Sequence, residues 1–197
     1  MSIDQYPRVQ VASGKELRAW LSENHATSPG CWLVTWKKGR GPYLPYADLV
    51  RELLCFGWID SKGQRVDDDR TSLLITPRRP GSGWSRVNKE HLEVLLAEGR
   101  MHPAGLAAVE QAKADGSWTR LDAVETLAEP DDLRAALDAV PRARAEWDAF
   151  PRSTRRAILE WIGSAKRPTT RASRIETTVS EAAVGRRANQ PRQPGGA

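Results

Sequence analysis

The residues that are best suited to bind a ligand form a short loop rich in arginine, glycine and tryptophan. Residues 78–85 read RRPGSGWS, and the two glycines lead into a segment that begins like a helix. Free backbone N–H groups at the start of a helix attract anions, and Arg78 adds a positive charge just upstream. Arg78, the backbone of residues 81–85 and Asn88 therefore form a candidate anion site. The alternative interpretation is that these residues only turn the chain and cap the helix.

Two of the eight tryptophans differ from the others in their surroundings. Most lie on apolar stripes, where one indole buries about 150–250 Å². Trp58 and Trp84 are flanked by polar residues, and an indole beside arginine or aspartate suits a planar, sugar-like or stacked ligand. We expect a ligand cleft between a hairpin and the helix that starts near Ser85. The candidate residues of this cleft are Trp58, Asp60, Arg65, Arg78, Trp84, Ser85 and Asn88.

Positive charge is concentrated at the C-terminal end of the chain. Residues 1–163 hold 23 basic and 23 acidic side chains, whereas residues 164–197 hold seven basic and two acidic ones, which gives the net charge of +5. A basic helix face can bind phosphates by charge attraction and counterion release. The alternative is a solvated polar helix. The candidate basic surface consists of Lys166, Arg167, Arg171 and Arg174, the last three at helical spacing.

Signals for catalysis, metals and cofactors are weak. A nucleophile needs an oriented base beside it, and the best candidate, Cys55, ends an apolar run where cysteine usually packs as a small hydrophobe. His91 is the candidate base, and it falls on an expected core stripe. The three consecutive aspartates at 67–69 lie in a tight turn, where neighbouring carboxylates point in different directions. We therefore expect no metal and no cofactor, and an enzyme that uses Cys55 or His91 is the third functional hypothesis.

The hydrophobic pattern predicts an α+β fold, with a small N-terminal sheet and hairpin packed with helices and an all-helical last third. Ser13 and Glu16 form a capping box before the first helix. A strand at 31–38, a helix from Pro45 to Gly57 and a hairpin over 58–76 follow. The next helix, from Ser85 to Gly99, has an expected inner stripe, and another helix covers 104–115. The residues of that stripe are Val87, His91, Val94 and Leu95.

The last third is punctuated by proline, and we expect helices that start near Pro130, Pro141, Ser153 and Thr170. The resulting domain prediction is an α+β core at 1–118, a helical extension packed on it at 119–185, and a disordered basic tail at 186–197. The longest run without charge is too short and polar to span a bilayer. The first ten residues, MSIDQYPRVQ, lack a secretory signal, so we expect a cytoplasmic protein without membrane insertion.

Four long motifs resemble the bacterial YdeI/OmpD-associated family, also called bacteriocin-protection proteins. They occur in the order of the family and read LCFGWID (54–60), TPRRPGSGWSRVNKE (76–90), GRMHPAGLAAVEQAKADGSW (99–118) and WIGSAKRPTTRASRI (161–175). One departure is the loop around Gly81 and Gly83, which is richer in glycine than the family pattern. The resemblance implies a small α+β protein of unestablished biochemistry. The family label implies tolerance of antimicrobial peptides or association with a porin, and the resemblance transfers no catalytic residue.

Three functions therefore follow as hypotheses from the sequence. The first is a non-catalytic cytoplasmic binding or stress-tolerance protein, whose partner is a small anion held in the tryptophan–arginine cleft or another protein. The second is a nucleic-acid-associated protein that uses the basic C-terminal helix. The third is the enzyme described above. The sequence leaves the oligomeric state and the strand order open.

Overall fold

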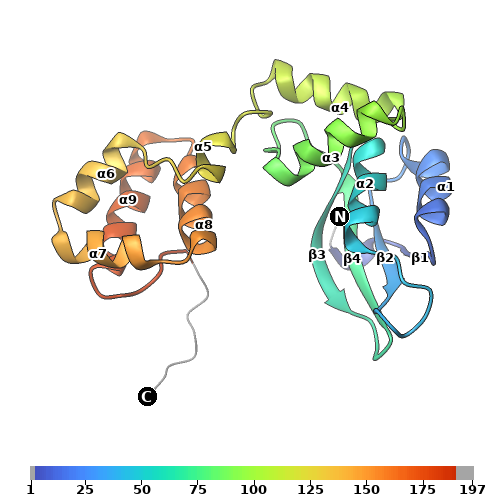
Figure 1. Ribbon diagram of the computed structural model, residues 1–197, viewed down its shortest axis with the longest axis horizontal. Coiled ribbons are helices and arrows are strands. Elements are labelled where there is room, and N and C mark those ends of the chain that lie inside the picture. The colour runs from blue at the N-terminus through green and yellow to red at the C-terminus, as the bar shows by residue number, and fades with distance from the viewer. Residues whose placement is uncertain (1–2, 190–197) are drawn as a thin grey trace. The chain divides into compact units, whose positions relative to one another are not determined.

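The computed structural model describes residues 3–189. Its contacts divide the chain into two compact units, Met1–Thr119 and Arg120–Ala197 (Figure 1). The first unit combines a four-stranded sheet with helices, and the described part of the second unit is helical. The predicted α+β class with a helical C-terminal part is thus confirmed. Within the described residues, no helix is long and apolar enough to cross a membrane.

The sheet of the first unit has the strand order β1-β2-β4-β3. Its strands are β1 (Arg8–Gln10), β2 (Cys31–Trp36), β3 (Trp58–Arg65) and β4 (Arg70–Pro77). The predicted hairpin is the antiparallel pair β3–β4, and β2, predicted to be buried on both faces, has five buried residues in succession. The sequence did not predict β1, which pairs in parallel with β2 over three residues. Three residues are too few for an alternating pattern to stand out.

Helices α1 (Gly14–Asn24) and α2 (Tyr46–Cys55) cover one face of the sheet, and Figure 1 shows α2 in front of the strands. Leu17 of α1 and Leu53 of α2 meet Leu33 and Ile75 of the strands in one core. Two further helices, α3 (Arg86–Ala97) and α4 (Pro103–Ala114), pack against α2. A Cβ atom on Gly105 would lie 2.2 Å from the carbonyl oxygen of Cys55. Glycine at this position therefore lets α4 approach α2 closely.

The predicted inner stripe of α3 is wrong for two of its four residues. Val87 and Val94 are 50% and 45% exposed, and the buried side chains are Leu92 and Leu95. His91 lies at the edge of the interface, where its Nδ1 is 3.4 Å from Nε of Arg51 on α2. The helix is thus rotated relative to the prediction, because two leucines bury more apolar surface against α2 than two valines would.

His102 caps α4 in a way that requires a neutral imidazole. Its Nδ1 accepts a hydrogen bond from Ala104 N at 3.2 Å, and its ring lies 4.6 Å from that of His25. Burial, together with the charges of His25 and Arg18, lowers the pKa of His102 below its usual 6.5. A protonated ring could not accept the Ala104 N–H. The cap therefore contributes its full stability above pH 6.5 and loses it as the pH falls through the lowered pKa of the folded state.

We expect the first unit to melt at a lower temperature as the pH falls from about 8 to about 5. A His102→Asn variant keeps a side-chain acceptor at the cap but does not titrate, so its melting temperature should fall less over the same range. Thermal unfolding of both proteins, followed by circular dichroism, tests this expectation. An equal fall in the two proteins would show that His102 does not carry the effect.

The second unit contains α5 (Asp122–Glu125), α6 (Asp131–Asp138), α7 (Pro141–Ala149), α8 (Arg152–Gly163) and α9 (Pro168–Ala182). They pack around a core that includes Leu133, Trp147 and Ile162. Helix α7 begins at Pro141 as predicted. Helix α8 begins at Arg152 rather than after Ser153, and α9 begins at Pro168 rather than Thr170. In both cases a proline at or just before the first turn defines the start, since its fixed φ suits that position.

Most of the tail predicted at 186–197 lies outside the described residues, which end at 189. Ala188, within the described part, is 3% exposed and packs in the core of the second unit.

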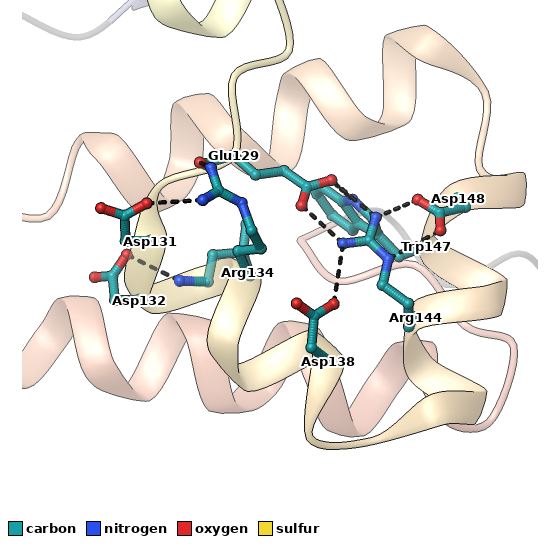
Figure 2. A network of polar contacts seen from close by, with 9 residues as sticks. Glu129, Asp131, Asp132, Arg134, Asp138, Arg144, Trp147 and Asp148 are labelled. Atoms are coloured by element: carbon teal, nitrogen blue, oxygen red, sulfur yellow. Dashed lines mark hydrogen bonds and ion pairs between the residues drawn. The ribbon is translucent and has the colours of Figure 1, made fainter.

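A network of polar contacts connects the beginning of α6 with α7 (Figure 2). The carboxylate of Glu129 accepts from Nη1 and Nη2 of Arg144 at 2.7 and 2.8 Å, and from Nε1 of Trp147 at 2.8 Å. Arg144 also contacts Asp138 and Asp148, so that one guanidinium lies among three carboxylates. These contacts fix the buried Trp147 and join two helices of the second unit.

Candidate functional site

The loop over residues 78–84, between β4 and α3, covers a small cavity against α4. The cavity has a volume of about 40 Å³ and lies entirely within the first unit. A space of this size holds a few water molecules, a small ion or one end of a larger ligand. Its lining residues are Arg78, Arg79, Pro80, Gly81, Ser82, Trp84, Ala108, Gln111, Ala112, Asp115 and Ser117.

Arg78 brings a buried positive charge to this cavity. Its backbone N–H donates to Gly57 O at 2.9 Å, which continues the pairing at the end of the sheet. The guanidinium carbon lies 3.8 Å from the centroid of the Trp84 ring, and Nη1 donates to Gly83 O at 3.1 Å. The atoms Nε and Nη2 are buried and have no hydrogen-bond partner. Burial lowers the pKa of Arg78 to about 10, partly opposed by the charge of Asp60, so the side chain stays cationic near neutral pH.

Trp84 adds a third donor without a partner. Its side chain is fully buried, its indole Nε1 makes no hydrogen bond, and its ring lies 5.4 Å from that of Trp118. A buried donor without an acceptor costs about 1–3 kcal/mol. The three atoms together, Nε and Nη2 of Arg78 and Nε1 of Trp84, therefore need acceptors that the described residues do not supply.

A hydrogen bond to Asp115 connects the loop to the end of α4. One carboxylate oxygen accepts from Gly81 N at 3.0 Å, and the other accepts from Ser117 N at 2.9 Å. Sequence reasoning missed this residue and Ser117, although the run Asp-Gly-Ser after a helix is a typical turn signal. The loop thus has a defined conformation over the cavity, and both Asp115 oxygens already hold backbone N–H groups.

Of the seven predicted cleft residues, the structure brings Arg78 and Trp84 to the cavity itself. Ser85 lies beside it and caps α3 by accepting from Asn88 N at 3.3 Å. Asn88 does not line the cavity. Asp60 acts on the cavity only through its charge on Arg78, and its carboxylate accepts from the Tyr46 hydroxyl at 2.9 Å.

Two of the seven residues lie elsewhere. Trp58 is 1% exposed and packs edge-on against Trp20 at 5.7 Å, so it belongs to the core and not to a stacking wall. Arg65 is at the far end of β3, where its 70% exposed side chain contacts Asp68. The cleft is therefore smaller than the sequence predicts.

The four residues of the candidate basic surface are not equivalent. Arg171 donates to both carboxylate oxygens of Asp132 at 2.7 and 2.8 Å. Arg174 donates to Trp161 O and to Ser164 Oγ, and its guanidinium lies over the Trp161 ring. Lys166 and Arg167 are exposed just before α9. Half of the surface is thus engaged within the second unit.

The residues proposed for catalysis lack the required surroundings. Cys55 is fully buried as a free thiol, and burial raises its pKa, partly opposed by a hydrogen bond from Arg18. Such a thiol is a poor nucleophile. His91 has Arg51 as its hydrogen-bond neighbour. Among residues 3–189, no group of three or more His, Cys, Asp or Glu side chains is placed to hold a metal ion.

A second, larger cavity is a groove along α9 in the second unit. Its volume is about 720 Å³, and its walls come from α6, Val140 just before α7, and one side of α9. Ion-paired Asp132 and Arg171 lie at its edge. We call this surface the α9 groove, and it is lined by Asp132, Ala136, Val140, Pro168, Arg171, Ala172, Ile175, Glu176, Val179, Ser180 and Ala183.

The fold and the two cavities define a two-part protein, an α+β unit followed by a helical unit. Residues 9–108, about half of the chain, match the family model described as "Domain of unknown function (DUF8412)", and the chain belongs to that family. Residues 126–185 match the model described as "Bacteriocin-protection, YdeI or OmpD-Associated", which confirms the predicted resemblance for the helical unit. No curated protein and no solved structure gives a significant match.

Proposed function

We propose that this protein is a cytoplasmic binding protein without catalytic activity, which acts in stress tolerance. Its first unit binds a small anion, or the anionic end of a larger ligand, in the cavity beside Arg78 and Trp84. The observation that carries this proposal is the buried Arg78 guanidinium, whose Nε and Nη2 have no partner. Bacteriocin protection, in the description of the matching family, supports the role in stress tolerance.

A comparison with Glu52 shows what is unusual about Arg78. Glu52 is also a buried charge, but its carboxylate accepts from both Arg18 and Arg100. Among the described residues, no carboxylate lies within ion-pair distance of Arg78. Because an uncompensated buried charge costs several kcal/mol, a bound anion would recover much of that cost.

The two free cysteines support the non-catalytic role and the cytoplasmic location in the proposal. The buried thiol of Cys55 favours a binding role over catalysis. Cys31 and Cys55 are both free, which fits a reducing compartment such as the cytoplasm.

Titration of the ¹⁵N-labelled protein with small anions tests the binding site directly. The indole N–H resonance of Trp84, assigned with a Trp84→Phe variant, should shift and saturate, because Trp84 lines the cavity and its ring lies against the Arg78 guanidinium. Arg65→Met removes the same charge from an exposed site far along β3 and should leave the shift unchanged. A short oligonucleotide in a parallel titration examines the nucleic-acid alternative, since phosphate contacts through Lys166 and Arg167 would weaken as salt rises.

The α9 groove supports a second candidate function, because it lies within the segment that matches the bacteriocin-protection family. Bacteriocins are antibacterial peptides or proteins, and an apolar groove of about 720 Å³ can receive the apolar face of an amphipathic helix. We propose that the groove binds such a peptide. Ala136, Val140, Ile175 and Val179 would contact its apolar side chains.

We expect Ala172→Arg to weaken this binding by about tenfold or more, because the new side chain fills and charges the groove. Ala172 is exposed on α9, and arginine is a good helix former, so the fold should persist. Fluorescence anisotropy of a labelled synthetic peptide with a leucine-rich face measures the effect. Arg78→Met should bind the peptide like the wild type. Equal binding to wild type and Ala172→Arg would place the peptide elsewhere.

A further inference from the structure

We infer that the cavity beside Arg78 selects a carboxylate, a planar group with a single negative charge, over tetrahedral dianions such as sulfate and phosphate. This inference rests on the proposed function of the same site and adds the chemical class of the ligand. Three observations support it: the free edge of Arg78, the position of Asp115 and the size of the cavity.

The free atoms of Arg78 lie on one edge of its guanidinium. Nη1 is occupied by Gly83 O, whereas Nε and Nη2, which form the side-on edge, have no partner. Two parallel N–H groups on such an edge match the two oxygens of one carboxylate. Trp84 also lines the cavity, and its buried Nε1 is a further donor without a partner. The donor set is therefore complete for a two-oxygen acceptor.

The charge balance of the cavity disfavours a second negative charge. Among the lining residues, Arg78 is the cation whose guanidinium nitrogens Nε and Nη2 are buried, and Asp115 places a carboxylate on the same cavity. Both oxygens of Asp115 already accept backbone N–H groups, and these hydrogen bonds keep its carboxylate ionised. Arg79 also lines the cavity, but its side chain is exposed, and water and salt screen its charge. A monoanion neutralises Arg78, whereas a dianion adds repulsion from Asp115.

The size and the walls of the cavity also favour a carboxylate. A volume of about 40 Å³ suits a group the size of formate or acetate. Ala108 and Ala112 of α4 form an apolar part of the wall. The methyl or methylene group next to a carboxylate can contact such a wall, whereas the extra oxygens of sulfate or phosphate would lose their hydration against it.

The test is a set of titrations of the full-length wild-type protein with formate, acetate, sulfate and phosphate at constant ionic strength, read from the Trp84 indole N–H. We expect formate or acetate to bind about tenfold or more tightly than either tetrahedral anion. Asp115→Asn keeps one acceptor oxygen and removes the charge, so it should reduce this preference by raising the affinity for sulfate.

The outcomes distinguish a failure of the inferred ligand class from a failure of the proposed anion site. If sulfate or phosphate binds as tightly as acetate, the inferred ligand class is wrong, while the anion site itself remains supported. If no anion shifts the Trp84 resonance, the proposed function fails, and the ligand class fails with it. If Asp115→Asn leaves the preference unchanged, charge repulsion from Asp115 is not its origin. Because the wild-type titrations need no variant, a folding defect in Asp115→Asn cannot obscure the main result.

Discussion

Arg78→Met is expected to abolish anion binding and, at the same time, to stabilise the ligand-free protein by about 1 kcal/mol. The guanidinium is buried without a bonded carboxylate, and two of its nitrogens have no partner. Methionine keeps much of the apolar stem that lies over Trp84 and removes the cost of the unpaired charge. The substitution loses one hydrogen bond to Gly83 O, which limits the gain. A residue whose removal stabilises the fold but eliminates binding is typical of a functional site.

Urea unfolding of the ligand-free proteins, combined with the anion titration, measures both effects. Arg65→Met is the matched control, because it removes one arginine charge from a 70% exposed side chain. We expect it to change neither stability nor binding appreciably. If Arg78→Met were strongly destabilising and still bound anions, Arg78 would serve only to support the loop.

Arg144→Met is expected to destabilise the second unit by about 2–3 kcal/mol. The substitution removes two hydrogen bonds from Glu129, whose side chain is only 17% exposed, and leaves its carboxylate with Trp147 Nε1 as its remaining side-chain donor. It also leaves the carboxylates of Asp138 and Asp148 without their shared cation. The expected loss is below that of a fully buried pair, because Arg144 is itself 22% exposed.

The control for this prediction lies in the same network. Arg134 pairs with Asp131 on the surface of α6, where the two side chains are 54% and 96% exposed (Figure 2). Arg134→Met should therefore cost about 0.5 kcal/mol or less. Chemical unfolding followed by far-ultraviolet circular dichroism compares the two variants. Equal losses would show that burial does not determine the strength of this network.

The Glu129 contacts also predict the acid stability of the second unit. Hydrogen bonds from Arg144 and Trp147 hold the pKa of Glu129 below its usual value of 4.5, against the opposing effect of burial. A carboxylate with a lowered pKa contributes its full stability above 4.5 and loses it as the pH falls through the folded value. Arg144→Met should therefore lose less stability than the wild type over that acidic range.

The sequence predicts most elements of this fold because their signals are local. The predicted cap of Ser13 is present, because Glu16 N donates to Ser13 Oγ, and the return bond to the Glu16 carboxylate comes from Ala12 N, one residue before the cap. Proline marks the beginning of several C-terminal helices for the same local reason. The orientation of α3 was missed, since it depends on which side chains fit against α2, and that is a property of the tertiary packing.

Two of the predicted cleft residues line the cavity, and the positions of the others have a geometric explanation. Arg78 and Trp84, which line the cavity, are predicted together because a positive charge and an indole follow each other in a glycine-rich loop. Arg65 is predicted in the same cleft, although it lies seven positions along β3 from Trp58, about 23 Å in an extended strand. Asp115 was missed because its contact with Gly81 joins residues 34 positions apart, and no local pattern predicts such a pairing.

The most direct test of the anion site is the titration of ¹⁵N-labelled protein with acetate, followed at the Trp84 indole N–H. We predict a saturating shift of this resonance in the wild type and in Arg65→Met, and no shift in Arg78→Met. An unchanged Trp84 resonance in the wild type, or the same saturating shift in Arg78→Met, would contradict an anion site at the buried guanidinium.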